Sequence, residues 1–544
     1  MKRRSFVKTL PLITAPAFVG NIPLRLMAGT LGYFFGPVNN DRVVVIIQLA
    51  GGNDGLNAVI PIAQYDTYYN YRSNIAIPQD GERMYIDLDE NFPLDQKVGI
   101  HPDMTGFKDL YDLRHAMLVQ NVGYENMNMS HFRGRDIWFN GGDYDDYYPS
   151  GWAGRFLEHI YPGYPDDYPN PQMPDPLALE FGYTISLLYQ RDTGIPAGLA
   201  IKDPAGFYSL INATGIEPPT TFPDSHAGEE MAYIAGLELK SNQYALRLND
   251  VYAKGINSPN VEYPQTYPYN APPEFINNPL SDQLKIVARL LSGGIKTRFF
   301  LVRIDGWDTH AGQVLQNDPT IGAHAALLYH LTSTAKAFQQ DLADQGMDDR
   351  VLTMTTSEFG RRVYSNDSLG TDHGKAAPVF LFGTQLKGGV IGDPPNLNDL
   401  NNGNLKYLID YRQLYTSVLF DWLGATYDAI EAAYFEDFIE SRLDIINIPT
   451  GLSDQAGKNF IEPFCYPNPA SDHTIIRFRL NGSAQANILV LDSGGKLVEQ
   501  IVYSGIASGQ QEKRLNLDGL KKGLYLVTIK SGAATGTCKL IVNK

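Results

Sequence analysis

Five carboxylates and three histidines stand in five short polar motifs of the 544-residue sequence. The motifs come after four apolar runs, the last two after the same run. The motifs are Gly51-Gly-Asn-Asp54-Gly-Leu-Asn57, Asn126-Met-Asn-Met-Ser130-His131-Phe-Arg133, Asp305-Gly-Trp307-Asp308-Thr-His310, Ser357-Glu358-Phe-Gly-Arg361 and Gly370-Thr-Asp372-His373-Gly374. Asp, Glu and His side chains suit zinc, manganese, magnesium or calcium. A divalent ion lowers the pKa of a bound water or hydroxyl and stabilises charge on a phosphoryl or sulfuryl oxygen. The motifs therefore predict metal-assisted hydrolysis.

The elements that must position these motifs are buried strands. Apolar runs without alternation predict strands covered on both faces at Asp41–Leu49, Ala116–Gln120, Phe299–Ile304, Val351–Thr355 and Val379–Phe382. Helical patterns lie between or beyond them at Glu229–Ala253, Asp282–Ser292, Ala323–Ala343 and Tyr411–Leu423. Alternating strands and helices predict an α/β domain with helices on both faces of its sheet. Because ligands bind at the carboxyl ends of such strands, the motifs are expected to meet in one crevice.

Some of these residues have a structural interpretation as well as a functional one. Ser130 precedes an apparent helix, where its hydroxyl either attacks a substrate anion at the positive end of the helix dipole or only caps the helix. Asp54 and Asn57 beside glycines are also typical of an Asx-type turn. Glu358 and Arg361 are also placed for a structural ion pair, and Trp307 for packing. The Asp308/His310 and Asp372/His373 pairs are the hardest to explain by packing.

Composition excludes some function classes. The formal net charge of −16 and the pI near 5.1 argue against a nucleic-acid partner, which requires a basic face. No segment after the N-terminal region has the roughly 18 uninterrupted apolar residues of a membrane helix. The two cysteines, Cys465 and Cys538, are compatible with a disulfide in an oxidising compartment or with two unpaired thiols.

The N-terminus predicts an export signal over residues 1–29. A cationic start is followed by a short apolar stretch that Pro11, Pro16, Gly20 and Pro23 interrupt. The segment Arg3-Arg-Ser-Phe-Val-Lys8 resembles the twin-arginine export motif.

The C-terminus changes character after about residue 450. A linker is expected over residues 451–464, and alternating apolar runs at Thr474–Leu480, Ala486–Leu491, Gly523–Ile529 and Cys538–Val542 predict a small β-sandwich. Tyr466-Pro-Asn-Pro, the Asp492-Ser-Gly-Gly turn and the final Lys539-Leu-Ile-Val-Asn-Lys are similar to the C-terminal sorting domain of type IX secretion, here residues 465–544. The resemblance implies type IX machinery as a partner and a secreted or surface-displayed product.

Residues 41–450 carry a second resemblance. The five motifs, together with Gly151-Trp-Ala-Gly-Arg155 and Tyr411-Arg412, are similar to the family called domain of unknown function 1501, which resembles the alkaline phosphatase and sulfatase superfamily. That resemblance implies an alkaline-phosphatase-like sheet with one or two divalent metals. It implies Ser130 as the nucleophile and a ligand set of Asp54, Asp308, His310, Glu358 and His373, with Asp372 as an additional ligand.

Three departures from the superfamily pattern are visible. Phe359 stands where a ligand histidine is expected, which puts the second metal in doubt. The spacing from Asp308 to His310 is shorter than usual, so Asp305 competes with Asp308 as ligand. Ser130 lacks the motif of formylglycine-type sulfatases, which makes that class of enzyme unexpected.

Two functions are compatible with the sequence. One is an exported metal-dependent hydrolase of phosphate or sulfate esters, with Ser130 attacking beside His131 and with Arg133 or Arg361 holding the anion. The other is a non-catalytic surface protein on the same scaffold that binds glycans or a partner. Its contacts would come from an aromatic-rich insert, residues 141–176, that contains Tyr144, Tyr147, Tyr148, Trp152, Tyr161, Tyr164 and Tyr168.

Overall fold

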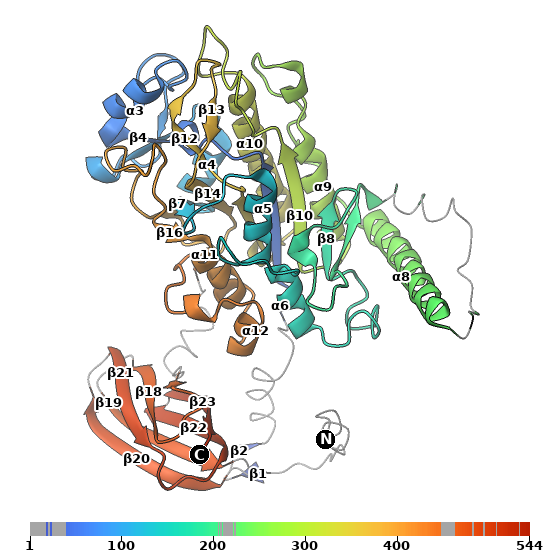
Figure 1. The fold of residues 1–544 in the computed structure, drawn as a ribbon, viewed down its shortest axis with the longest axis vertical. Coiled ribbons are helices and arrows are strands. Elements are labelled where there is room, and N and C mark those ends of the chain that lie inside the picture. The colour runs from blue at the N-terminus through green and yellow to red at the C-terminus, as the bar shows by residue number, and fades with distance from the viewer. Residues whose placement is uncertain are drawn as a thin grey trace. The chain divides into compact units, whose positions relative to one another are not determined.

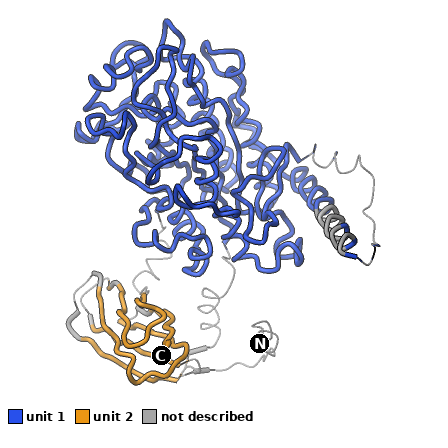
Figure 2. The backbone as a smooth tube through the Cα atoms, viewed as in Figure 1, with its two compact units in different colours: residues 1–447 blue, residues 448–544 orange. Residues whose placement is uncertain are grey.

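The computed structural model describes two compact parts of the chain. The described residues are 18–19, 22–23, 40–204, 206, 209, 221, 223, 225–447, 463–480, 484–492, 496–506, 509–531 and 534–544. They divide into a first unit, residues 1–447, and a second unit, residues 448–544 (Figure 2). The predicted export signal lies outside the described residues apart from the paired strands β1 (Phe18–Val19) and β2 (Ile22–Pro23). The predicted linker lies outside them up to residue 462.

A nine-stranded mixed sheet forms the centre of the first unit (Figure 1). In spatial order its strands are β15 (Gly389–Ile391), β7 (Ala116–Gly123), β14 (Ala377–Phe382), β11 (Val351–Thr356), β3 (Val43–Ala50), β10 (Phe299–Asp305), β8 (Ala178–Phe181) and β9 (Gly198–Ile201), with β16 (Ile409–Asp410) paired to β7. All five predicted strands are present. Only β14 runs antiparallel to its neighbours, because the chain leaves β11 and returns from the same edge of the sheet without a crossover helix.

The central strands β3, β7 and β11 bury both faces, and each face of the sheet has its own core. Along β3, Val44 and Ile46 face one core while Val43, Val45 and Ile47 face the other. The first core is closed by α5 (His131–Asn140), α6 (Trp152–Ile160), α11 (Tyr411–Ser417), a π-helix (Val418–Trp422) and α12 (Tyr427–Ala432). The second is closed by α4 (Thr105–Asp112), α8 (His226–Lys254), α9 (Pro279–Ser292) and α10 (Ala323–Asp344). The predicted α/β class with helices on both faces is confirmed.

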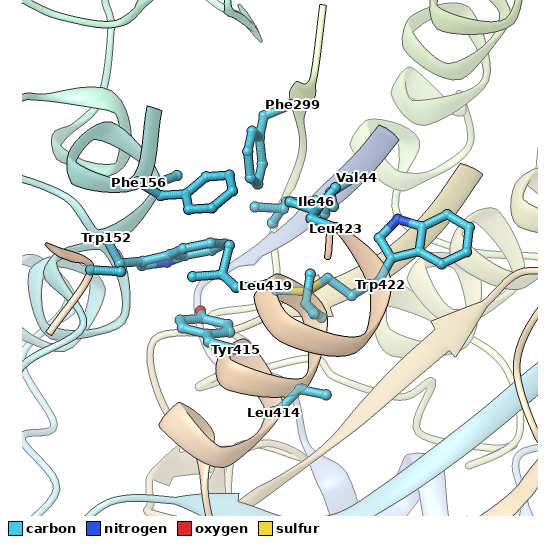
Figure 3. Packing of buried hydrophobic residues seen from close by; sticks show 14 of the residues in the cluster. Val44, Ile46, Trp152, Phe156, Phe299, Leu414, Tyr415, Leu419, Trp422 and Leu423 are labelled. Atoms are coloured by element: carbon cyan, nitrogen blue, oxygen red, sulfur yellow. The ribbon is translucent and has the colours of Figure 1, made fainter. Parts of the chain in front are cut away.

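Large aromatic side chains fill the first core. Trp152 lies flat against Tyr415, with 4.6 Å between ring centroids, and meets Phe299 edge-on (Figure 3). Trp152 is fully buried, so this member of the aromatic insert serves packing and not ligand binding.

Smaller elements stand at the edge of the sheet where the strands β3, β10 and β11 end. They are α2 (Gly55–Ala58), β4 (Val59–Pro61), α3 (Tyr65–Arg72), β5 (Ile86–Asp87), β6 (Val98–Ile100), β12 (Arg361–Ser365) and β13 (Thr371–His373). Single 3-10 turns occupy Ile62–Gln64, Leu94–Gln96, Leu187–Tyr189, Pro273–Phe275, Asp348–Arg350 and Glu436–Phe438. Among the described helices, none combines the length and apolar character of a membrane span.

The second unit is all β, as predicted. One sheet contains β17 (Phe464–Tyr466), β18 (His473–Leu480) and β21 (Gly509–Asn516), and the other contains β20 (Leu497–Ile506), β19 (Ala484–Asp492), β22 (Gly523–Ser531) and β23 (Ala534–Val542). All pairings within these sheets are antiparallel, and one apolar core contains residues of both sheets. Strands β20 and β21 were not expected from the sequence, since β21 in particular is almost entirely polar.

Candidate metal centre

Four strand ends meet at one edge of the central sheet. Strands β3, β10 and β11 are parallel neighbours whose ends are nearly level, with Asp305 opposite Ala50 and Thr356 opposite Gln48. Strand β7 runs in the same direction, because β14 is antiparallel to both β7 and β11. The polar motifs that follow these strands therefore share one edge, which is where open α/β sheets bind ligands.

Glycines allow the strand ends to approach closely. Gly51 has φ +130°, and a Cβ there would lie 2.2 Å from the backbone nitrogen of Asp308. A side chain at position 51 would thus push the end of β3 away from the loop after β10. Gly51 is required by this contact, and a Cβ at Gly52 would meet the ring of Phe359 at 2.5 Å.

The carboxylate of Asp308 is the centre of a histidine cluster. Its oxygens lie 3.1 Å from Nε2 of His373, 3.2 Å from Nε2 of His310 and 3.3 Å from Nε2 of His131. His131, Asp308 and His373 offer ligand atoms that all lie within 4.8 Å of one another. The four side chains are between 24% and 45% exposed, so a small ligand can reach them.

The other ring nitrogen of each histidine faces an oxygen that only accepts hydrogen bonds. Nδ1 of His373 lies 2.8 Å from the carbonyl of Met129, and Nδ1 of His131 lies 3.0 Å from Oε1 of Glu358. Nδ1 of His310 lies 3.3 Å from Oδ1 of Asp372. With a cation bound between the rings and Asp308, such partners would hold the ring proton on Nδ1 and leave the lone pair of Nε2 free to bind the ion.

This arrangement fits a bound cation. Without a cation, each ring would have to donate from both nitrogens to satisfy both acceptors, and protonating all three rings would crowd positive charge around Asp308, which already pairs with Arg361. Burial lowers the pKa of His373 even though its bonds to Met129 and Asp308 oppose the shift, and this favours the neutral ring. Histidines that hold a metal through one nitrogen and donate to an oxygen through the other are common in metal sites. His131, Asp308 and His373 thus form a candidate metal site.

Arg361 stands behind the centre. Its buried guanidinium donates to the carbonyls of Gly51, Gly52, Trp307 and Thr371 and, at 2.6 Å, to Oδ1 of Asp308. Burial alone would raise the pKa of Asp308, but the hydrogen bond and charge of Arg361 lower it. Arg361 therefore holds three loops together and keeps Asp308 ionised.

Glu358 is buried beneath His131. Its Oε1 accepts hydrogen bonds from the backbone nitrogen of Gly51 at 2.8 Å and from Nδ1 of His131. Its Oε2 is buried and has no hydrogen-bond partner among the residues that the structure describes. The ring of Phe359, next in the chain, lies 4.4 Å from that of His373 and 4.9 Å from that of His131. An apolar wall thus occupies the position where the superfamily pattern suggests a further ligand.

Asp54 is placed apart from this cluster. It is fully buried, and both of its oxygens lie within 2.8 Å of Nη1 of Arg72, while Gln313 donates to Oδ2 at 2.7 Å. Burial raises the pKa of Asp54, but the charges of Arg72 and His324 and the hydrogen bonds from Arg72 and Gln313 together outweigh it and leave the pKa lowered. Asn57 belongs to the same network through Arg72 and Tyr68. Neither Arg72 nor Gln313 could be identified from the sequence, because neither lies in one of the motifs.

Ser130 directly precedes α5, and Arg133 lies in the first turn of this helix. Ser130 is the N-cap residue, but its side chain makes no capping hydrogen bond, and the residue is exposed. Ser130 directly precedes His131, which belongs to the cluster, in the chain. Arg133 donates to the carbonyls of Tyr144 and Asp146 and stacks on Tyr147, 3.9 Å from the ring centroid. Its charge is therefore used to hold the loop after α5.

Two parts of the chain match known families. Residues 272–418 match the family described as "Protein of unknown function (DUF1501)", and residues 465–543 match the "Secretion system C-terminal sorting domain". The two family resemblances drawn from the motifs are confirmed over these residues. The sorting domain indicates export to the cell surface or the medium, and it implies the type IX secretion system as a partner. The twin-arginine signal stays a prediction.

Similar solved structures resemble the chain only distantly. A sulfatase from Pseudoalteromonas sp. has 13% identity over 88% of this chain and 84% of that chain, with a TM-score of 0.32. A protein in the alkaline phosphatase superfamily from Vibrio parahaemolyticus has 8% identity over 92% and 82%, with a TM-score of 0.31. Dimeric latent PorU from Porphyromonas gingivalis has 20% identity and a TM-score of 0.13, and the chain covers 9% of its length and 15% of its own. These likenesses assign no activity to the chain. No curated protein matches it.

Proposed function

We propose that the first unit is a divalent-metal-dependent hydrolase of phosphate or sulfate esters that acts outside the cell or at its surface. The observation that carries the proposal is the convergence of three Nε2 atoms on the carboxylate of Asp308. Each imidazole is held in that orientation by a separate oxygen of Met129, Glu358 or Asp372. Such support is expected of a metal centre and has no purpose in packing.

His131, Asp308 and His373 would hold the ion, and His310 would complete a set of four. A set with three imidazoles favours zinc over manganese, magnesium or calcium, which prefer oxygen ligands. When bound, the ion would polarise an ester oxygen and stabilise the charge that develops on it.

The chain's own residues would attack the ester, hold Asp308 in place and exclude water. Ser130 is the attacking hydroxyl in this proposal, because it is exposed beside His131 and its side chain caps no helix. Arg361 would fix Asp308 from behind. Phe359 would keep water and a further ligand away from the inner side of His131 and His373.

The observations favour this function over a binding role for the aromatic insert. Trp152 is in the core, Tyr161 and Tyr164 each pack against Tyr168, and Tyr148 packs against Tyr434. In the insert, Tyr144 and Tyr147 are the large aromatic side chains that the structure places as exposed. Tyr147 already covers the guanidinium of Arg133.

Metal analysis and ester turnover of the full chain would test the proposal. We expect one divalent ion per chain, its removal by a chelator, and hydrolysis of an aryl phosphate or aryl sulfate by the metal-loaded protein. Ser130→Ala should abolish turnover while the metal stays bound, and Ser73→Ala, at another exposed serine, should change neither. Metal-free protein that hydrolyses neither ester after reloading with zinc or manganese would refute it.

A further inference from the structure

The two cysteines of the chain lie against each other in the second unit. Cys465 on β17 and Cys538 on β23 have their sulfur atoms 3.2 Å apart. They are 73 residues apart in the sequence and belong to different sheets of the unit. Cys465 is buried in the apolar core and Cys538 packs against it.

The backbone around the pair is already held in place. Asn468 bridges the first and last strands, since its Nδ2 donates to the carbonyl of Lys539 and its Oδ1 accepts from the nitrogen of Ile541 at 2.7 Å. Ala470 accepts from Asn543 and donates to Ile541. The two thiols are therefore brought together by a fixed frame, so joining them requires a small displacement of the sulfur atoms.

We propose that Cys465 and Cys538 form a disulfide in the exported protein. The sorting domain directs the chain out of the reducing cytoplasm, and disulfides persist in the compartments beyond it. The oxidant would be a protein or small-molecule disulfide. The two thiols lose two protons and two electrons and form one S–S bond. The S–S bond of the oxidant breaks, and its two sulfur atoms take up the protons and electrons to become two thiols.

The bond would hold in place β17, which is the shortest of the described strands in this unit. Strand β17 pairs through three residues with β18 as its one partner within its sheet. A link from β17 to β23 closes a long loop and restricts the unfolded chain, which stabilises the folded unit. The bond would thus keep the start of the sorting domain attached to its end.

The test is a count of free thiols in the full chain. The hydrogen bond between the thiols and their burial raise the pKa of Cys538, so oxidation is carried out during refolding in oxidised glutathione. Denatured protein is then treated with a maleimide-coupled polymer. We expect no label on the refolded wild type and two labels after reduction. Two labels on the refolded protein, or glutathione attached to it by mass, would overturn the proposal.

Thermal unfolding provides a second readout. Reduction should lower the transition of the second unit by about 10 °C in the wild type. It should leave the transition of the Cys465→Ala/Cys538→Ala double variant unchanged. An equal transition in oxidised and reduced wild type would refute the stabilising role of the bond. Neither outcome bears on the metal centre, so this proposal fails or holds independently of the proposed function.

Discussion

Glu358 accepts a hydrogen bond from Nδ1 of His131 through the same oxygen that accepts the backbone nitrogen of Gly51. One buried carboxylate oxygen thus connects the end of β3, the loop after β11 and the first residue of α5. This contact fixes both the tautomer and the direction of His131, and it makes Glu358 a positioning residue for the proposed centre.

Replacing Glu358 by Gln should weaken metal binding without removing it. The amide oxygen can still accept from Gly51, but the negative charge that strengthens His131 as a ligand is lost. We expect the metal dissociation constant to rise about 10- to 100-fold, measured by competition with a chromogenic chelator. Asp80→Asn, at an exposed loop position, is the matched control. Equal affinity in Glu358→Gln and wild type would contradict the positioning role.

The histidines of the cluster should differ in importance. His131 and His373 offer ligand atoms within 4.8 Å of each other and of Asp308. His310 is the most exposed of the three histidines, and its Nδ1 contacts the exposed Asp372. His373→Ala should therefore lose stoichiometric metal, and His310→Ala should retain it with an affinity reduced about 10- to 100-fold. Elemental analysis after gel filtration measures both, with His159→Ala as an exposed control. Greater metal loss in His310→Ala than in His373→Ala would contradict this ranking.

Asp54 should matter for stability and not for metal content. Asp54→Asn leaves the fully buried guanidinium of Arg72 without its counter-charge, which costs about 3–5 kcal/mol for buried pairs of this kind. Urea unfolding measures the loss, and metal analysis of the folded fraction should give the wild-type ratio. If the folded variant lacks metal, Asp54 is a ligand as the superfamily resemblance implies.

The first unit should lose stability in mild acid. Burial lowers the pKa of His324 to about 4, with the nearby Asp54 opposing the shift, while an unfolded histidine has a pKa near 6.5. Between these pH values the unfolded chain binds a proton at His324 that the folded chain does not bind. The stability is therefore full above pH 6.5 and falls as the pH drops toward 4. The loss approaches about 3 kcal/mol.

His324→Gln isolates this contribution. Glutamine can still donate to Oδ1 of Asn53, the partner of Nε2 in the wild type, but it does not titrate. We expect the urea midpoint of the variant to fall less between pH 7.5 and pH 5 than that of wild type or His159→Gln. An equal fall in all three would show that His324 is not responsible.

The sequence predicted the strands of the first unit because each is an unbroken apolar run, and burial on both faces removes every other pattern. It also predicted that Asp54, Asp308, His310, Glu358 and His373 would meet at one point, since the strand ends share one edge. The structure brings the last four together, whereas Asp54 pairs with Arg72. The sequence did not predict which neighbouring groups surround or orient these side chains. Arg72 and Gln313, which surround Asp54, lie in no motif, and nothing in the motif that contains Met129 marks its carbonyl as the partner of His373. Strand β21 was missed for a related reason, since its polar residues form a strand only when β18 lies beside them.

The distance in sequence between His131 and His373 has a consequence for how the protein acquires its metal. His131 is the first residue of α5, Asp308 follows β10 and His373 ends β13, so no two of the three ligands are neighbours in a nascent chain. Loading must come after the sheet has closed. The identity of the ion would then be decided by the compartment in which the chain finishes folding and by the metals available there, more than by the intrinsic affinity of the donor atoms.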